Sequence, residues 1–189
     1  MNERAWVRHF GEIGLGDRPS VGGKGASLGE LQRAGIAVPP GCVVTTDAFR
    51  HVLDACDRGA SVRRRIESLV ADDLDAIGAT SAELRALVER VELPAALHAD
   101  IAASLQRVCG GELDAPMAVR SSATSEDGAE ASFAGLQDTY LWVRGADAVV
   151  EHVRRCCASL YSVEYRRPAC HCVPAGNRQE GAGFGIIAS

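Results

Sequence analysis

The spacing of apolar residues divides the chain into parts with different patterns. Near the N-terminus, residues 6–10 are mostly apolar and predict a short strand, and residues 42–44 predict a second, buried strand. Between them, residues 21–31 change from a glycine-rich stretch to helical spacing, so we expect a loop that leads into a helix. Thr45 or Thr46 is placed to cap the helix that follows the second strand.

Residues 60–110 have apolar residues at helical spacing. Thr80 and Glu83 fit a capping box, in which a hydroxyl and an acid three residues later close the start of a helix. Pro94 suits the first turn of the next helix, which Gly110 would end. No residue pattern here points to chemistry, so we assign the apolar stripes to a core and expect a structural, helical segment.

The pattern changes to strands after Pro116. Residues 117–122 predict a strand that runs into a polar loop, and residues 139–143 predict a second strand. The stretch between them is rich in Ser, Gly, Ala and acidic residues, which indicates an antiparallel pair joined by a long functional loop. Asp147 is placed to cap the long amphipathic helix that follows.

Beyond Arg167 the periodicity is lost. Pro168 and Pro174 would break any helix in this part of the chain. We therefore expect one domain over residues 1–167, with its helical segment at about 60–110, and a divergent, disordered tail over residues 168–189.

Composition limits the class of protein. The chain has 189 residues, 47% of them hydrophobic, which is enough for one domain with a core. Its net charge of -5 gives no electrostatic reason to expect nucleic acid or an anionic membrane as a partner. No apolar run approaches the roughly 20 residues of a membrane span. Residues 1–10 lack the apolar stretch of a secretory signal, so we expect the protein in the cytoplasm.

The cysteines carry little functional signal. Seven cysteines, an odd number without an export signal, indicate reduced thiols instead of a disulfide framework. Cys170, His171 and Cys172 could suggest a zinc site, but no second ligand pair follows at the spacing of a zinc finger. We therefore predict no metal site from the residues of this chain.

Lysine is used only once. Of the 20 basic residues 19 are Arg, and the single lysine, Lys24, stands in the glycine-rich stretch. An ammonium group is a compact point charge that suits phosphate oxygens. Gly22, Gly23 and Gly25 would let the backbone approach an anion, and the following helix would present its positive N-terminal end. The spacing is not that of a Walker A loop, and chance is an alternative when this stretch is read alone.

Two later segments add candidate phosphate or nucleotide contacts. Arg120, at the end of a strand and beside several hydroxyls, suits bidentate phosphate binding. The alternative is an ion pair with Glu126 or Asp127 in a solvated loop. Gly135 would allow close backbone approach to a ligand, and Thr139 could offer its hydroxyl to a nucleotide. The alternative for this last segment is a plain strand start.

Together, these segments resemble the ATP-binding domain of phosphoenolpyruvate synthase (pyruvate, water dikinase) and its relatives, the pyruvate phosphate dikinases and rifampicin phosphotransferases. The resemblance covers about residues 5–166 and implies a fold of the α/β (α+β) class: an incomplete, ATP-grasp-like domain with a helical insert. It implies that Lys24 and Arg120 hold the triphosphate, and that Gly135 and Thr139 lie in the glycine-rich loop over the nucleotide. The stretches that carry it are VGGKGASLGEL, VPPGCVVTTDAF and AVRSSATSEDGAEASFAGLQDTYLWV.

The resemblance also implies a reaction, the conversion of ATP, pyruvate and water to AMP, phosphoenolpyruvate and phosphate. It implies ATP and Mg²⁺ as cofactors, with the Mg²⁺ ligands outside this chain. The second half of the ATP domain, the domain with a phosphorylated His and the pyruvate-binding barrel are not recognised here. His171 lacks the context of the family's phospho-histidine, so no residue receives a catalytic role.

We therefore expect the chain by itself to be inactive. Pyruvate would be a partner only if the missing domains were supplied, and a companion chain or a homo-oligomer is a further possibility. Three alternatives remain: a truncated, non-catalytic nucleotide-binding module, a fragment of a rifampicin-type antibiotic phosphotransferase, or a structural helical protein with chance motifs.

Overall fold

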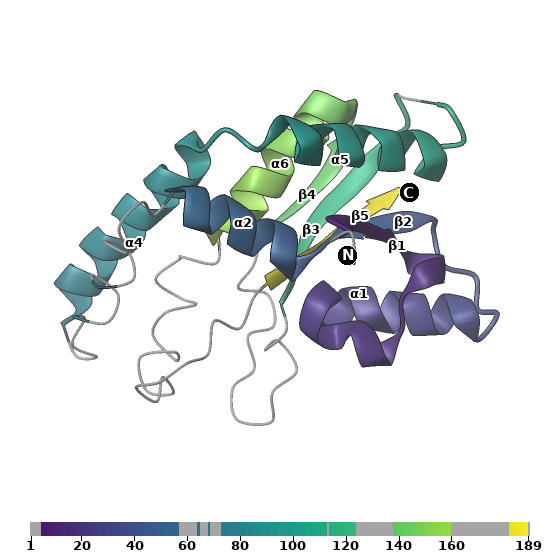
Figure 1. The fold of residues 1–189 in the computed structure, drawn as a ribbon, viewed down its shortest axis with the longest axis horizontal. Coiled ribbons are helices and arrows are strands. Elements are labelled where there is room, and N and C mark those ends of the chain that lie inside the picture. Colours follow the sequence, from purple (N-terminus) through teal and green to yellow (C-terminus); the bar gives the residue numbers. More distant parts are fainter. Residues whose placement is uncertain are drawn as a thin grey trace.

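The computed structural model describes residues 5–56, 64, 68, 73–112, 114–123, 138–159 and 182–188. Within these residues the strands form one five-stranded sheet in the order β1-β2-β5-β3-β4, in which all neighbours are antiparallel (Figure 1). The strands are β1 (Val7–His9), β2 (Gly41–Val44), β3 (Met117–Ala123), β4 (Thr139–Val143) and β5 (Ala182–Ala188).

Helices cover both faces of this sheet (Figure 1). On one face α5 (Ala95–Val108) packs against β1 and β2, and α6 (Ala146–Ser159) packs against β3 and β4. On the other face α1 (Arg18–Arg33) packs against β5, β3 and β2. In the described ranges, two further α-helices, α2 (Thr46–Cys56) and α4 (Leu74–Arg90), contact each other, and α4 also packs against α6.

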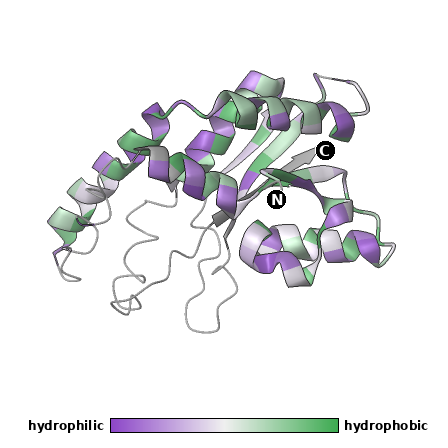
Figure 2. Cartoon of the chain, viewed as in Figure 1, coloured by the Kyte–Doolittle hydropathy of each residue, from purple (hydrophilic) through white to green (hydrophobic). Residues whose placement is uncertain are grey.

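Each face of the sheet has its own hydrophobic core. The larger core lies under α5 and α6 and includes Met117 and Val119 of β3. The smaller core lies under α1, where Val21 and Ala26 meet Val43 of β2. In Figure 2 α5 and α6 each show a hydrophobic and a hydrophilic side, as expected for helices that bury one stripe. No helix in the described ranges has both the length and the apolar character of a membrane span.

Several local predictions are confirmed. The strands expected at residues 6–10 and 42–44 are β1 and β2, and β2 is buried along its whole length. The antiparallel pair expected after Pro116 is β3 and β4. The Thr45 hydroxyl accepts the N–H of Ala48 at 3.4 Å and so caps α2. The mixture of helices and strands agrees with the predicted α/β class.

The predicted capping box at Thr80 and Glu83 is wrong. Helix α4 begins more than a turn earlier, at Leu74, and the side chain of Asp73 accepts the N–H of Ala76 at 3.0 Å. Thr80 therefore lies inside the helix, where its side chain is buried. Asp is at least as good an N-cap as Thr, so the helix begins directly after the earlier of the two residues. Asp147 is likewise in the first turn of α6 instead of capping it.

The prediction of a disordered tail is wrong for residues 182–188. These residues form β5, which lies between β2 and β3 in the middle of the sheet. The prediction rested on the loss of periodicity beyond Arg167, and residues 182–188 include small residues such as Gly183 and Gly185. In the sheet the facing edges of β2 and β3 both need backbone partners, and β5 supplies them. The division of the chain at residue 167 stays a prediction, because residues 160–181 lie outside the described ranges.

Candidate functional site

Helix α1 contains a break at the predicted phosphate loop. Gly22 has φ 74° and ψ 171°, so a single turn from Arg18 ends there and a second helical segment begins at Gly23. The expected loop-to-helix transition is therefore present, but a short turn of helix comes before it. The second segment places Lys24 in its first turn, where the N–H groups of a helix have no partner in the preceding turn.

The glycines of this segment are explained by contact with the sheet. A Cβ on Gly22 would lie 1.7 Å from the carbonyl oxygen of Ser122, on β3. A Cβ on Gly25 would lie 3.0 Å from Cγ2 of Val43, on β2. A Cβ on Gly29 would lie 2.5 Å from the carbonyl oxygen of Ile13. Close packing of α1 on its neighbours thus requires small residues here. From the sequence, Gly22 and Gly25 had been expected to let the backbone approach an anion.

Arg120 and Thr139 face the same side of the sheet as α1. They are directly paired across β3 and β4, so their side chains lie on one face. Ser122, two residues after Arg120, points to the same face and hydrogen-bonds to α1. Val119, directly before Arg120, belongs to the core on the opposite face. The strand pairing therefore brings two of the predicted site residues together on the α1 side.

Lys24 reaches this part of β3 from α1. Its Nζ atom donates to the carbonyl oxygen of Ser121 at 3.4 Å. Ser121 directly follows Arg120 along β3, so the structure brings the lysine and the strand end with the arginine together. Three of the four predicted site residues, Lys24, Arg120 and Thr139, thus lie around one end of the β3–β4 pair.

Arg120 has a buried side-chain nitrogen without a hydrogen-bond partner in the part of the chain that the structure describes, a feature that it shares with Arg154 on α6. The unpaired atom of Arg120 is Nε. An unpaired, buried guanidinium N–H is costly, because it has lost water without gaining an acceptor.

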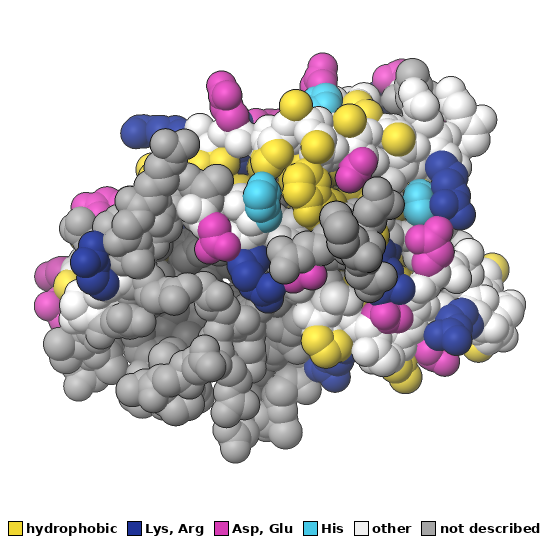
Figure 3. Space-filling view, viewed as in Figure 1, with side chains coloured by type: hydrophobic (Ala, Val, Ile, Leu, Met, Phe, Trp, Pro, Cys, Tyr) yellow, Lys and Arg dark blue, Asp and Glu magenta, His cyan; other side chains and the backbone are white. Residues whose placement is uncertain are grey.

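Over the face drawn in Figure 3, acidic and basic side chains are interspersed, so the described charges do not gather into one patch there. Any attraction for an anion would therefore come from a few local groups.

Two titratable groups near this site, on β4 and α6, stay protonated at neutral pH. Burial, together with a hydrogen bond to Asp138 at 3.0 Å, raises the pKa of Tyr140 to about 12. Burial also raises the pKa of Cys156 to about 12, with Asp138 adding to this rise and Lys24 opposing it. Both groups stay protonated at neutral pH, so neither supplies a general base.

Gly135, the fourth predicted site residue, lies outside the described residues. The described ends of the segment that contains it, Ala123 of β3 and Asp138, are at the same end of the β3–β4 pair as Lys24. Cys170, His171 and Cys172 also lie outside the described ranges. Within those ranges no group of three or more His, Cys, Asp or Glu side chains is arranged to hold a metal ion.

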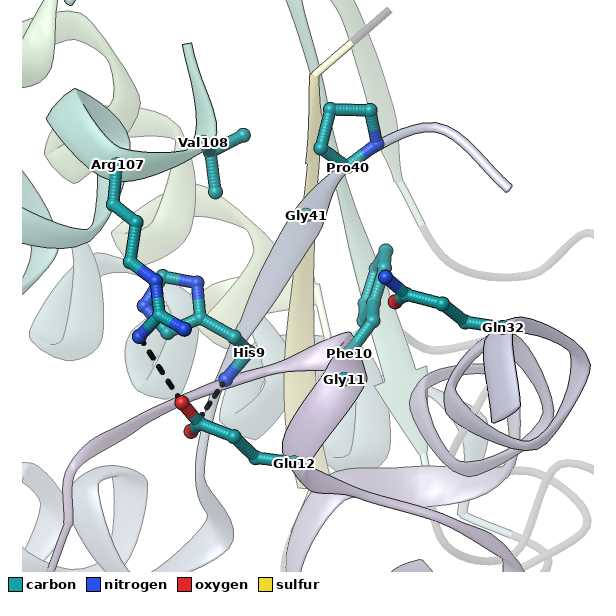
Figure 4. Close-up of a pocket in the computed structure, with 9 residues that line it drawn as sticks. All are labelled: His9, Phe10, Gly11, Glu12, Gln32, Pro40, Gly41, Arg107 and Val108. Carbon is teal, nitrogen blue, oxygen red and sulfur yellow. Dashed lines mark hydrogen bonds and ion pairs between the residues drawn. The ribbon is translucent and has the colours of Figure 1, made fainter. Parts of the chain in front are cut away.

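A separate hollow of about 250 Å³ opens near the Gly41 end of β2 (Figure 4). None of the predicted site residues lines it. Glu12 accepts from Arg107 at 3.1 Å and from the backbone N–H of His9 at 3.3 Å, so the arginine charge is already balanced. Burial and the Arg107 charge lower the pKa of His9, which is therefore neutral at pH 7. The lining residues are His9, Phe10, Gly11, Glu12, Gln32, Pro40, Gly41, Arg107 and Val108.

The role of Ser122 was not predicted from the sequence. The hydroxyls after Arg120 were expected beside a bound phosphate, whereas Ser122 is fully buried against α1 and hydrogen-bonds to it. Gly22 could have indicated this role in the sequence. A glycine at the start of a helix has no side chain to cap it, so another residue has to accept the free N–H.

Comparison with known proteins adds the family. Residues 18–169 match the profile described as pyruvate phosphate dikinase, AMP/ATP-binding domain. This range includes Lys24, Arg120, Gly135 and Thr139.

Curated relatives are similar over most of the chain. A probable phosphoenolpyruvate synthase of Methanocaldococcus jannaschii is 43% identical over 84% of this chain and 13% of its own length. The phosphoenolpyruvate synthase of Deinococcus radiodurans is 42% identical over 85% of this chain and 21% of its own length. A rifampicin phosphotransferase of Streptomyces sviceus is 48% identical over 86% of this chain and 19% of its own length.

The chain thus spans about a fifth or less of the length of these three relatives. The family profile covers well over half of the chain, and the two independent comparisons agree on the same group of proteins. The chain belongs to the family of the pyruvate phosphate dikinase AMP/ATP-binding domain.

Proposed function

We propose that this domain binds ATP at the end of the β3–β4 pair that faces α1. Lys24 and Arg120 would neutralise oxygens of the triphosphate, and Thr139 would offer its hydroxyl to the nucleotide. Gly135 would contribute backbone in the segment between β3 and β4. The fold would then be of the ATP-grasp type, in which a nucleotide lies between the sheet and a glycine-rich loop.

The observation that carries this proposal is the buried, unpaired Nε of Arg120 on the face that Lys24 and Thr139 share. An anion at this face would supply an acceptor for the unpaired Nε of Arg120 and a negative charge beside both cations. A guanidinium binds two phosphate oxygens at once, while the ammonium of Lys24 acts as a point charge. The helix segment that starts at Gly23 adds a positive dipole end.

Within the described residues, the acids form no group of three or more that could hold a metal ion by themselves. A nucleotide-bound Mg²⁺ is held mainly by phosphate oxygens and water, with one or two carboxylates. We assign no described residue as a magnesium ligand. The described chain therefore supplies binding and charge neutralisation for phosphates, which are the main protein contributions to phosphoryl transfer.

For the whole reaction we propose a phosphoenolpyruvate synthase-like dikinase, in which this domain is the ATP-binding part. The names of the Methanocaldococcus and Deinococcus relatives support this assignment. The 48% identity to the Streptomyces sviceus rifampicin phosphotransferase supports an antibiotic phosphotransferase as the second candidate. Assays of ATP turnover with pyruvate and with rifampicin as acceptors would separate the two.

We also propose that a companion chain or a second copy of this chain contacts the domain at the edge of the sheet. Strand β4 is at the edge of the sheet and exposes Leu141 (63%) and Trp142 (74%). Exposed apolar side chains on an edge strand are a suitable contact for another polypeptide. We propose the cytoplasm as the location, because the family's reaction uses intracellular metabolites.

The proposal is tested by replacing the single lysine. In Lys24→Ala we expect the dissociation constant for ATP to rise about tenfold to hundredfold, because a hydrogen bond to a charged group contributes about 1.5–3 kcal/mol. Isothermal titration calorimetry on the full chain gives this constant directly. Arg90→Ala is the matched control, since it also removes one positive charge but lies on α4, which packs against α6 and α2. Equal ATP affinity in Lys24→Ala and the wild type would refute the proposed site.

A further inference from the structure

The second segment of α1 begins without a capping side chain of its own. Gly22 has non-helical backbone angles and immediately precedes the segment, so it occupies the position from which a Ser, Thr, Asp or Asn would normally cap the helix. A cap normally satisfies the N–H of the second or third helical residue, and the third residue here is Gly25.

Ser122 on β3 supplies the missing cap. Its hydroxyl accepts the N–H of Gly25 at 2.9 Å and donates to the carbonyl of Val21 at 3.0 Å. The two hydrogen bonds connect the backbone on both sides of Gly22 to one side chain about 100 residues further along the chain. Because Ser122 is fully buried, water cannot replace either hydrogen bond.

The close approach of β3 depends on Gly22. The carbonyl oxygen of Ser122 occupies the space where a Cβ on residue 22 would be, at 1.7 Å. One residue earlier on β3, the carbonyl of Ser121 accepts from Nζ of Lys24 at 3.4 Å. The same short piece of strand therefore holds the helix start, contacts the lysine and carries Arg120.

We propose that Ser122 is a positioning residue for nucleoside triphosphate binding. It fixes the start of the second α1 segment on β3, so that Lys24 and the first N–H groups of the segment face the same polyphosphate as Arg120. This inference rests on the proposed ATP site and adds a residue that acts through Lys24. Without the Ser122 hydroxyl, the helix start would loosen and the ammonium would spend less time in the binding position.

A double-mutant cycle tests this role. ATP affinity is measured by calorimetry for the wild type, Ser122→Ala, Lys24→Ala and the double variant. We expect Ser122→Ala to weaken ATP binding about tenfold. If Ser122 acts through Lys24, the loss caused by Lys24→Ala should be at least threefold smaller when Ser122 is already alanine, because effects of coupled residues do not add. A purely structural role would give independent losses that multiply.

Controls separate the possible failures. Ser104→Ala removes another buried serine hydroxyl, on α5 at the opposite face, and should leave ATP affinity unchanged. If Ser122→Ala does not fold, Ser122→Cys retains the volume but weakens both hydrogen bonds, and the cycle is run with it. Unchanged affinity in the Ser122 variant, or losses that multiply, overturns the positioning role. Unchanged affinity in Lys24→Ala overturns the ATP site itself.

Discussion

Replacement of Gly22 by alanine tests how tightly α1 is fitted to the sheet. The backbone at Gly22, with φ 74° and ψ 171°, lies in a region that glycine adopts but residues with a Cβ avoid. The added methyl group would also meet backbone atoms of β3: the Ser122 carbonyl oxygen at 1.7 Å and its carbon at 2.4 Å. Unlike the end of a flexible side chain, these atoms cannot turn away.

The expected magnitude follows from these two effects. Holding a non-glycine residue in such a backbone conformation costs about 1–3 kcal/mol. Moving a packed strand to admit an extra methyl group costs about 1–3 kcal/mol more. We therefore expect Gly22→Ala to lower the free energy of unfolding by about 2–6 kcal/mol. This is a large share of the roughly 5–15 kcal/mol that stabilises a typical domain.

Equilibrium unfolding in urea, followed by circular dichroism, measures this loss. Gly78→Ala is the matched control, because Gly78 lies inside α4 and a Cβ there meets no atom within 4 Å. This control should gain about 0.5–1 kcal/mol, since alanine favours helix over glycine. If Gly22→Ala unfolds within about 0.5 kcal/mol of the wild type, the close approach between α1 and β3 is not as described.

Two further predictions concern titration and thiol reactivity. A hydrogen bond from Arg8 at 2.7 Å holds the pKa of Asp17 below its usual value near 3.8, so this pair adds stability above that pH and loses it as the pH falls further. The urea midpoint of Arg8→Ala should accordingly differ most from the wild type at pH 7 and approach it below pH 3.8; a constant difference down to pH 3 would contradict this. Burial raises the pKa of Cys42 and Cys156 to about 12, so at pH 8 only about one thiol in 10,000 is ionised. Iodoacetamide followed by mass spectrometry should leave both unmodified in the native protein and label both in urea; equal labelling in the two conditions would show that they are accessible.

Local sequence was sufficient for the elements whose pattern is strong. The apolar run at 42–44, the strand before Arg120 and the hydroxyl of Thr45 each predicted what the structure contains, because burial of an apolar strand and capping of a helix depend on adjacent residues. The family was likewise evident from the sequence, since its three motifs occur in order. At Thr80 the local pattern gave the wrong helix start, because Asp73 caps the helix earlier.

Tertiary structure alone decided how these elements meet. Residues 182–188 contain small residues that suggest flexibility, and they form a central strand because β2 and β3 both require hydrogen-bond partners. Sequence named Lys24 and Arg120 as candidates, but only the fold brings Lys24 to the carbonyl that follows Arg120. The cap that Ser122 gives to α1 joins residues about 100 positions apart. Such contacts depend on the packing of a helix against a strand, and a local sequence pattern does not predict that packing.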